Sequence, residues 1–139
     1  MKVINGAGLL LGRVCSFAAK AALFGEDVSI VNCEKIVISG KKKQVLANEK
    51  ARRSRKSYPL KSAKFSRLPE KYVKRSVRGM LPYKKERGLN AFKKIKCYVG
   101  IPPEFAEQKT ENVTGAEAKK LPTLNYITVD YICKHLGGK

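Results

Sequence analysis

The chain has 139 residues, 43% of them hydrophobic and 8% aromatic, which argues against disorder over its whole length. A chain of this length can bury roughly 70% of its unfolded surface, so we expect one domain over residues 1–139. The net charge of +19 and the pI near 10.0 indicate a polyanionic partner, either nucleic acid or an anionic membrane surface.

The first forty residues have the pattern of a strand, a helix and further strands. Residues 2–5 read as a short strand, and helical spacing of polar and apolar residues predicts a helix over 10–24. The β-branched runs at 28–33 and 36–38 are typical of buried strands. A strand, a long helix and a second strand predict the crossover connection of a parallel sheet.

Three glycines lie at the junction between the first strand and the helix. Gly6, Gly8 and Gly12, with Glu34 after the second strand, resemble a dinucleotide-binding fingerprint. However, the third glycine is one position late, the strand is very short, and three leucines begin the helix. A tight strand-to-helix turn explains the glycines without a cofactor, and a dinucleotide-binding enzyme stays open only as an alternative.

A continuous basic segment covers residues 41–96. It contains 21 of the 30 Lys and Arg but three of the 11 acidic residues, a difference of +18, whereas the other 83 residues carry +1. We expect its first helix to run from residue 39 or 40 to residue 53, and an aperiodic basic loop to follow over 54–68. A basic loop of this length points to a function rather than a simple connection.

The next helix is expected over residues 69–78 and has two different faces. Pro69 suits its first position and Gly79 suits its end. Val73 and Val77 form its apolar face, while the other face carries cations at i, i+3, i+4 and i+7, namely Lys71, Lys74, Arg75 and Arg78. A solvated surface is the simpler reading of such a stripe, but the one-signed charge of the whole segment favours a bound polyanion.

A second basic helix is expected over residues 84–94, after the break at Pro82. Leu89 and Phe92 are its predicted core residues. Gly88 within it marks either a tolerated imperfection or a place where another backbone approaches closely.

The C-terminal third is more mixed. Residues 95–99 read as a strand, and the capping-box pattern of Thr114 and Glu117 predicts a short helix. A last helix is expected to start near Thr128, because the following apolar residues recur with helical spacing.

The sequence favours neither a metal site nor an active site. The four cysteines, Cys15, Cys33, Cys97 and Cys133, form no CxxC pair, and they are expected to be reduced core thiols of a cytosolic protein. His135 is the single histidine, and its spacing identifies no nucleophile partner, so no enzymatic activity and no small-molecule substrate are predicted. No signal peptide and no run of ~20 apolar residues is found, so no membrane partner is expected.

The basic segment is therefore the predicted functional site, and structured RNA is the predicted ligand. Arginine binds phosphate oxygens in bidentate fashion, and the rings of Tyr58, Phe65, Tyr72 and Tyr83 could stack on unpaired bases. No helix-turn-helix or zinc-finger pattern indicates duplex DNA, although a general nucleic-acid-binding or compacting protein is the main alternative. The predicted RNA-binding residues are Arg52, Arg53, Arg55, Lys56, Lys61, Lys64, Arg67, Lys71, Lys74, Arg75, Arg78, Gly79, Lys84, Lys85, Arg87, Lys93 and Lys94.

Several short motifs resemble one protein family. The motif VRGMLP at 77–82, followed by Arg87-Gly88 and Val99-Gly100, closely resembles the signature of the universal family of large-subunit ribosomal proteins numbered thirteen. The N-terminal pattern is similar too, with LLGR at 10–13, NCE at 32–34 and ISG at 38–40, and GIPP at 100–103 looks like the archaeal and eukaryotic branch. The resemblance runs in the same order from residue 5 to about residue 105, and the tail over 106–139 matches less distinctively.

This resemblance implies a fold and a function. The fold would be a three-layer α/β fold around a small parallel sheet of about four strands, flanked by helices and carrying a basic helix-loop-helix insertion. The function would be that of a structural and assembly protein in the cytoplasmic ribosome, bound to large-subunit ribosomal RNA and to neighbouring large-subunit proteins. The family has no cofactor and no required catalysis, and its N-terminal glycines belong to the first turn of the fold.

Overall fold

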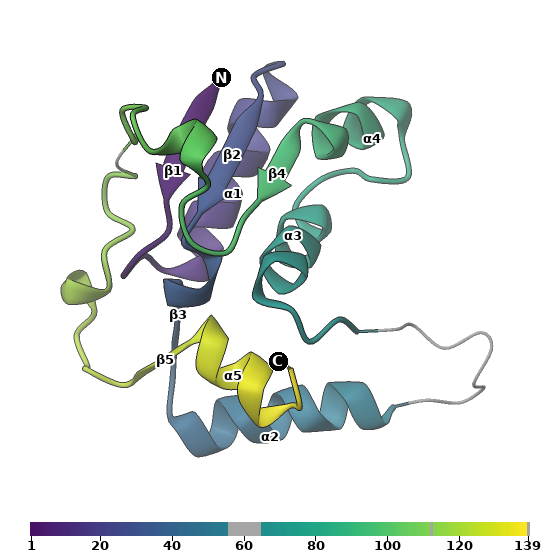
Figure 1. Cartoon of the computed structure of the whole chain (residues 1–139). Coiled ribbons are helices and arrows are strands. Elements are labelled where there is room, and N and C mark those ends of the chain that lie inside the picture. Colours follow the sequence, from purple (N-terminus) through teal and green to yellow (C-terminus); the bar gives the residue numbers. More distant parts are fainter. Residues whose placement is uncertain (56–64, 112, 139) are drawn as a thin grey trace.

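The computed structural model describes residues 1–55, 65–111 and 113–138 (Figure 1). Five helices and five strands are present in these ranges. In chain order they are β1 (Lys2–Asn5), α1 (Leu11–Leu23), β2 (Val28–Val31), β3 (Val37–Ser39), α2 (Lys42–Ser54), α3 (Pro69–Gly79), α4 (Glu86–Lys93), β4 (Ile95–Cys97), β5 (Tyr126–Thr128) and α5 (Val129–His135), with short 3₁₀ turns at Cys33–Lys35, Pro103–Phe105 and Ala118–Lys120.

A small parallel sheet lies at the centre of the fold. Its strand order is β1-β2-β4, with Ile4 opposite Ile30 and Val28 opposite Ile95. The predicted crossover through α1 is therefore confirmed, but this sheet has three strands and not about four. The strand β3 instead pairs antiparallel with β5 in a separate two-stranded sheet. Asn32 adopts a left-handed conformation with φ of 55°, and the 3₁₀ turn that follows it turns the chain away from the parallel sheet.

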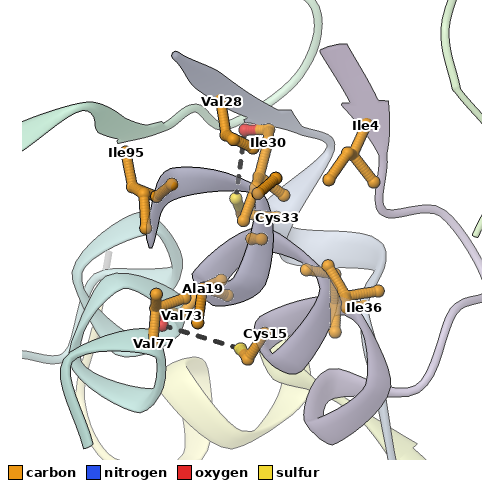
Figure 2. Packing of buried hydrophobic residues seen from close by; sticks show 14 of the residues in the cluster. Ile4, Cys15, Ala19, Val28, Ile30, Cys33, Ile36, Val73, Val77 and Ile95 are labelled. Carbon is orange, nitrogen blue, oxygen red and sulfur yellow. Dashed lines mark hydrogen bonds between the residues drawn. The ribbon is translucent and has the colours of Figure 1, made fainter. Parts of the chain in front are cut away.

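The core lies between the parallel sheet and the helices on one of its faces. Figure 2 shows Val28, Ile30 and Ile95 of the sheet above Ala19 and Cys15 of α1 and Val73 and Val77 of α3. The other face of the sheet carries a smaller cluster in which Val3 and Val31 meet Phe105. Cys15, Cys33 and Cys133 are buried and Cys97 is half-buried, as expected for core thiols. Burial raises the pKa of the Cys15 thiol to about 12.

The helix α4 packs through its small residues. Gly88 and Ala91 are buried, whereas Leu89, predicted to face the core, is 47% exposed. A Cβ atom on Gly88 would overlap the carbonyl group of Pro82. Gly88 therefore marks a close backbone approach, which decides between the two readings of this glycine.

The C-terminal region differs most from expectation. Thr114 and Gly115 form a turn in which Gly115 has a φ of 78°, so the predicted capping-box helix at this position is wrong. The strand β5 was not predicted either. The last helix begins where it was expected, because the Thr128 side chain accepts a hydrogen bond from the Tyr131 backbone N–H and caps α5. Within the described ranges, no helix combines the length and the apolar character that crossing a membrane requires.

Candidate nucleic-acid interface

A cationic groove of about 630 Å³ lies between α2 and α3. All four cations of the predicted α3 stripe line it, because Val73 and Val77 on the opposite face are buried against the core. From α2, Arg52 and Arg53 enter the same groove. The complete lining is Glu49, Arg52, Arg53, Phe65, Ser66, Lys71, Tyr72, Lys74, Arg75, Ser76, Arg78, Gly79, Tyr83 and Phe92.

Aromatic rings lie under the cations of α3. The Arg75 guanidinium carbon is 3.9 Å from the centroid of the Phe65 ring, and the Arg78 guanidinium carbon is 5.1 Å from that of Tyr83. The Lys74 ammonium is 5.2 Å from the centroid of Phe92. Such cation–π contacts limit the conformational freedom of these three side chains.

The cations also crowd one another. Burial, followed by the charges of Arg78, Arg52 and Arg53, lowers the pKa of Arg75. Four guanidinium groups from two helices therefore share one electrostatic environment. An anion entering the groove would relieve that repulsion.

One carboxylate lies among these cations. The side chain of Glu49 is 8% exposed, and its Oε2 lies 2.6 Å from Nη1 of Arg53 while its Oε1 lies 3.2 Å from Nη1 of Arg52. The hydroxyl of Tyr72, on α3, donates to Oε1 over 3.1 Å. Burial and the nearby carboxylate of Glu49 raise the pKa of Tyr72, so that phenol stays a donor.

The other predicted RNA-binding residues are spread over neighbouring surfaces. Arg55 lines a second hollow of about 570 Å³ on the β3 side of α2. Arg67 is exposed and its Nη1 donates to the Gly137 carbonyl over 3.4 Å. Exposed positions at the joint between α3 and α4 and in the first turn of α4 hold Lys84, Lys85 and Arg87.

Two predicted residues lie at the edge of the sheet, and three lie outside the described ranges. Lys93 and Lys94 line a hollow beside the parallel sheet that Asp27 and Glu104 also line, and the Lys94 ammonium donates to the Gly25 carbonyl over 2.7 Å. The residues outside the described ranges are Lys56, Lys61 and Lys64. The structure therefore brings seven of the predicted residues to one groove, namely Arg52, Arg53, Lys71, Lys74, Arg75, Arg78 and Gly79.

Gly79 is the one uncharged member of the predicted set. It is the last residue of α3 and is exposed, and a Cβ atom placed on it would have no neighbour within 4 Å. Open space at the end of a helix lets a ligand backbone approach closely.

Sequence reasoning named three of the aromatic residues that line the groove but missed the place of Glu49 in it. Glu49 precedes Arg52 and Arg53 at i, i+3 and i+4, a spacing that could have identified it as their partner. No comparable signal connects Glu49 to Tyr72, 23 residues away on another helix. Tyr83 was predicted to be a candidate for base stacking and Phe92 a core residue, but their positions beside Arg78 and Lys74 depend on tertiary packing.

The glycine turn at residues 6–8 is not built for a dinucleotide. Amides of the turn donate to groups of the protein itself, from Gly6 to the Val31 carbonyl and from Gly8 to the Lys35 carbonyl, and the Leu10 amide after the turn donates to the Ala116 carbonyl. A pyrophosphate requires such amides to be available. The glycines therefore serve the first turn of the fold.

The described part of the chain holds no group of three or more His, Cys, Asp and Glu side chains that could bind a metal ion. His135 is exposed near the end of α5, with its ring stacked on Tyr131 at a centroid distance of 6.4 Å.

Comparisons with known proteins agree along the whole chain. A family model described as ribosomal protein L13 matches residues 1–104. The protein named large ribosomal subunit protein uL13 in Methanococcoides burtonii is 42% identical over 139 residues, covering 100% of this chain and 99% of its own. Proteins of the same name in Methanocaldococcus jannaschii and Archaeoglobus fulgidus are 41% identical (100% of this chain, 99% of theirs) and 38% identical (97% and 86%).

Proposed function

The chain belongs to the ribosomal protein L13 family, and from this premise we propose that it is a structural protein of the large ribosomal subunit and not an enzyme. It binds large-subunit ribosomal RNA in the cytoplasmic ribosome, contacts neighbouring large-subunit proteins and assists subunit assembly. The proteins that it is similar to carry the name of a large-subunit protein, which supports this assignment.

The observation that carries the proposal is the convergence of cations from two helices. Arg52 and Arg53 of α2 line the same groove as the four-cation stripe of α3. The apolar face of α3 is anchored in the core, so the stripe is held in a fixed place rather than on a mobile tail. A fixed array of this kind replaces the counterions of folded RNA at little entropic cost.

The remaining predicted cations extend the proposed RNA-facing surface. In this proposal residues 41–96 act as a basic helix-loop-helix insertion on a three-layer α/β domain that spans 1–139. The guanidinium groups of the arginines bind phosphates, and Gly79 lets the RNA backbone approach the end of α3 closely. Lys56, Lys61 and Lys64, which lie outside the described ranges, are also proposed to bind RNA, and the exposed cations near α4 would reach a second RNA segment.

The salt dependence of RNA binding tests this proposal. We expect the affinity for a large-subunit RNA fragment to fall steeply as salt increases, because each neutralised phosphate releases counterions. Replacing Lys74, Arg75 and Arg78 by glutamine should flatten the slope by about one unit for each lost phosphate contact. Filter binding at several salt concentrations measures the slope, and an affinity that does not depend on salt would contradict the proposal.

A competition experiment separates this function from general nucleic-acid binding. Folded large-subunit RNA should displace a labelled RNA fragment at much lower concentration than duplex DNA of the same charge, because the groove is shaped by two helices and not by one helix fitted to a major groove. Equal competition by both polymers would favour a general nucleic-acid-compacting protein.

A further inference from the structure

The helix α2 is attached to the rest of the protein in an unusual way. Its single buried residue is the charged Glu49, whereas Val45 and Leu46 are only half-buried. Burial of apolar surface normally provides most of the energy that holds a helix in place. For α2, polar contacts must supply a large part of it.

Those polar contacts meet at the carboxylate of Glu49. Tyr72 connects it to α3 through a hydrogen bond of 3.1 Å. Nη1 of Arg53 donates to the carboxylate, and Nη2 of the same side chain donates to the Ser66 carbonyl over 3.4 Å, just before α3 begins. The same group therefore orients two arginines of α2 and links that helix to α3.

The residues of this contact belong to two hollows, the cationic groove of about 630 Å³ and the hollow of about 570 Å³ next to β3. Glu49, Arg52, Tyr72 and Ser76 line both of them. In Figure 1, α2 lies at the bottom of the view, away from the parallel sheet. The hydrogen bond between Glu49 and Tyr72 joins this helix to α3 at residues that line both hollows.

We propose that Glu49 is the positioning residue of the RNA-binding groove. Its carboxylate holds α2 against α3 through Tyr72 and fixes Arg52 and Arg53, so that cations from both helices meet one RNA backbone. This inference rests on the proposed function, because it assumes that the groove binds RNA. It goes further by assigning a favourable role in RNA binding to an acidic residue.

The proposal predicts a change in RNA affinity opposite to the one expected from charge alone when Glu49 is exchanged. Exchanging Glu49 for glutamine makes the groove more positive by one unit, which by Coulomb attraction should strengthen phosphate binding. If the carboxylate positions the arginines, the same exchange weakens binding instead, because two long side chains must then be ordered when RNA binds. The expected loss is about tenfold in affinity, the order of magnitude for immobilising two such side chains.

The experiment compares the full-length protein with Glu49→Gln, Tyr72→Phe and Glu86→Gln. Glu86→Gln is the matched control, because Glu86 is exposed in the first turn of α4 and its exchange makes the same change in charge. Fluorescence anisotropy with a labelled large-subunit RNA fragment measures affinity. Amide hydrogen exchange without RNA compares α2 with the buried strand β2.

We expect Glu49→Gln to lower the RNA affinity about tenfold and to speed amide exchange in α2, with β2 unchanged. Tyr72→Phe, which keeps the ring and all cations, should produce the same two effects more weakly. Glu86→Gln should leave α2 exchange unchanged and should not weaken binding. Unchanged α2 exchange in both groove variants, or tighter RNA binding by Glu49→Gln, would overturn the inference.

A double-mutant cycle tests whether Glu49 acts through its arginines. In a protein that already carries Arg52→Gln and Arg53→Gln, the further exchange Glu49→Gln should change the RNA affinity much less than it does alone. An undiminished loss of affinity would count against positioning. The salt dependence of wild-type binding separates failure of the proposed function from failure of this inference. An affinity that does not change with salt contradicts RNA binding by the protein. A steep salt dependence together with tighter binding by Glu49→Gln contradicts only the role of Glu49.

Discussion

Tyr83 is the aromatic residue of the groove best placed to stack on a base. The ring of Phe65 lies beneath Arg75, and the hydroxyl of Tyr72 is bound to Glu49. Tyr58 lies outside the described ranges. Tyr83 also has a cation beside its ring, but the guanidinium carbon of Arg78 is 5.1 Å from the ring centroid rather than 3.9 Å, and Tyr83 is 40% exposed.

Exchanging Tyr83 for leucine should therefore weaken binding to RNA that contains unpaired bases. Loss of one base–aromatic stack costs about 1–3 kcal/mol, so the dissociation constant should rise about 5- to 150-fold. The change should be much smaller for a fully duplex RNA of the same length, since duplex bases are not free to stack on the ring. Anisotropy titrations with the two RNAs measure the difference.

Tyr126 provides a matched control for this exchange. It is also 40% exposed but lies in β5, and it is not among the groove-lining residues. Tyr126→Leu should leave the affinity for both RNAs unchanged. If the two leucine variants behave alike, Tyr83 has no stacking role.

At the scale of elements, the two glycines that end α3 and lie within α4 have opposite surroundings. Gly88 lies against the backbone of Pro82, so α4 can approach the turn before it only without a side chain at this position. Gly79 faces open space at the end of α3. This contrast gives opposite expectations for the same substitution.

The exchange Gly88→Ala should destabilise the protein by about 1–3 kcal/mol, because the new methyl group overlaps a backbone carbonyl that cannot move freely. The exchange Gly79→Ala should leave stability unchanged or raise it by up to about 1 kcal/mol, the usual gain of alanine over glycine in a helix. Urea unfolding followed by circular dichroism gives both free energies. Equal stabilities of the two variants would refute the close approach at Gly88.

The elements that sequence reasoning predicted well are those defined by local signals. Pro69, Gly79 and the alternation of valines with cations define α3 almost to the residue. Leu89 was assigned to the core by its hydrophobicity, whereas the packing of α4 depends on the absence of a side chain at Gly88. The pairing of β3 with β5 and the contact of Glu49 with Tyr72 join distant parts of the chain, and a single sequence carries no local signal for either.

At the scale of the whole molecule, the buried thiols make global stability depend on pH. The folded protein raises the pKa of Cys15 to about 12 and that of Cys133 to about 11, from 9.0, chiefly through burial. These groups contribute stability that is fully present below the unfolded pKa and is lost as pH rises through the folded pKa.

The free energy of unfolding should therefore fall between about pH 9 and pH 12. The contribution of Cys15 alone is about 1 kcal/mol at pH 10, since the unfolded chain releases a proton that the folded chain retains. Urea unfolding at pH 8 and pH 10 measures the change, and Cys15→Ala should show a smaller fall over the same interval. A pH dependence identical in the two proteins would exclude Cys15 as its source.

The pairing of β3 with β5 has a consequence for how the protein is made. Val37 meets Thr128 and Ser39 meets Tyr126, so an early strand pairs with a strand that is synthesised much later. Domains begin to fold from the N-terminus while translation continues, but this contact must wait until β5 has been made. During that interval β3 is an open edge, and the newly made protein pairs it only when β5 has left the ribosome that produced it.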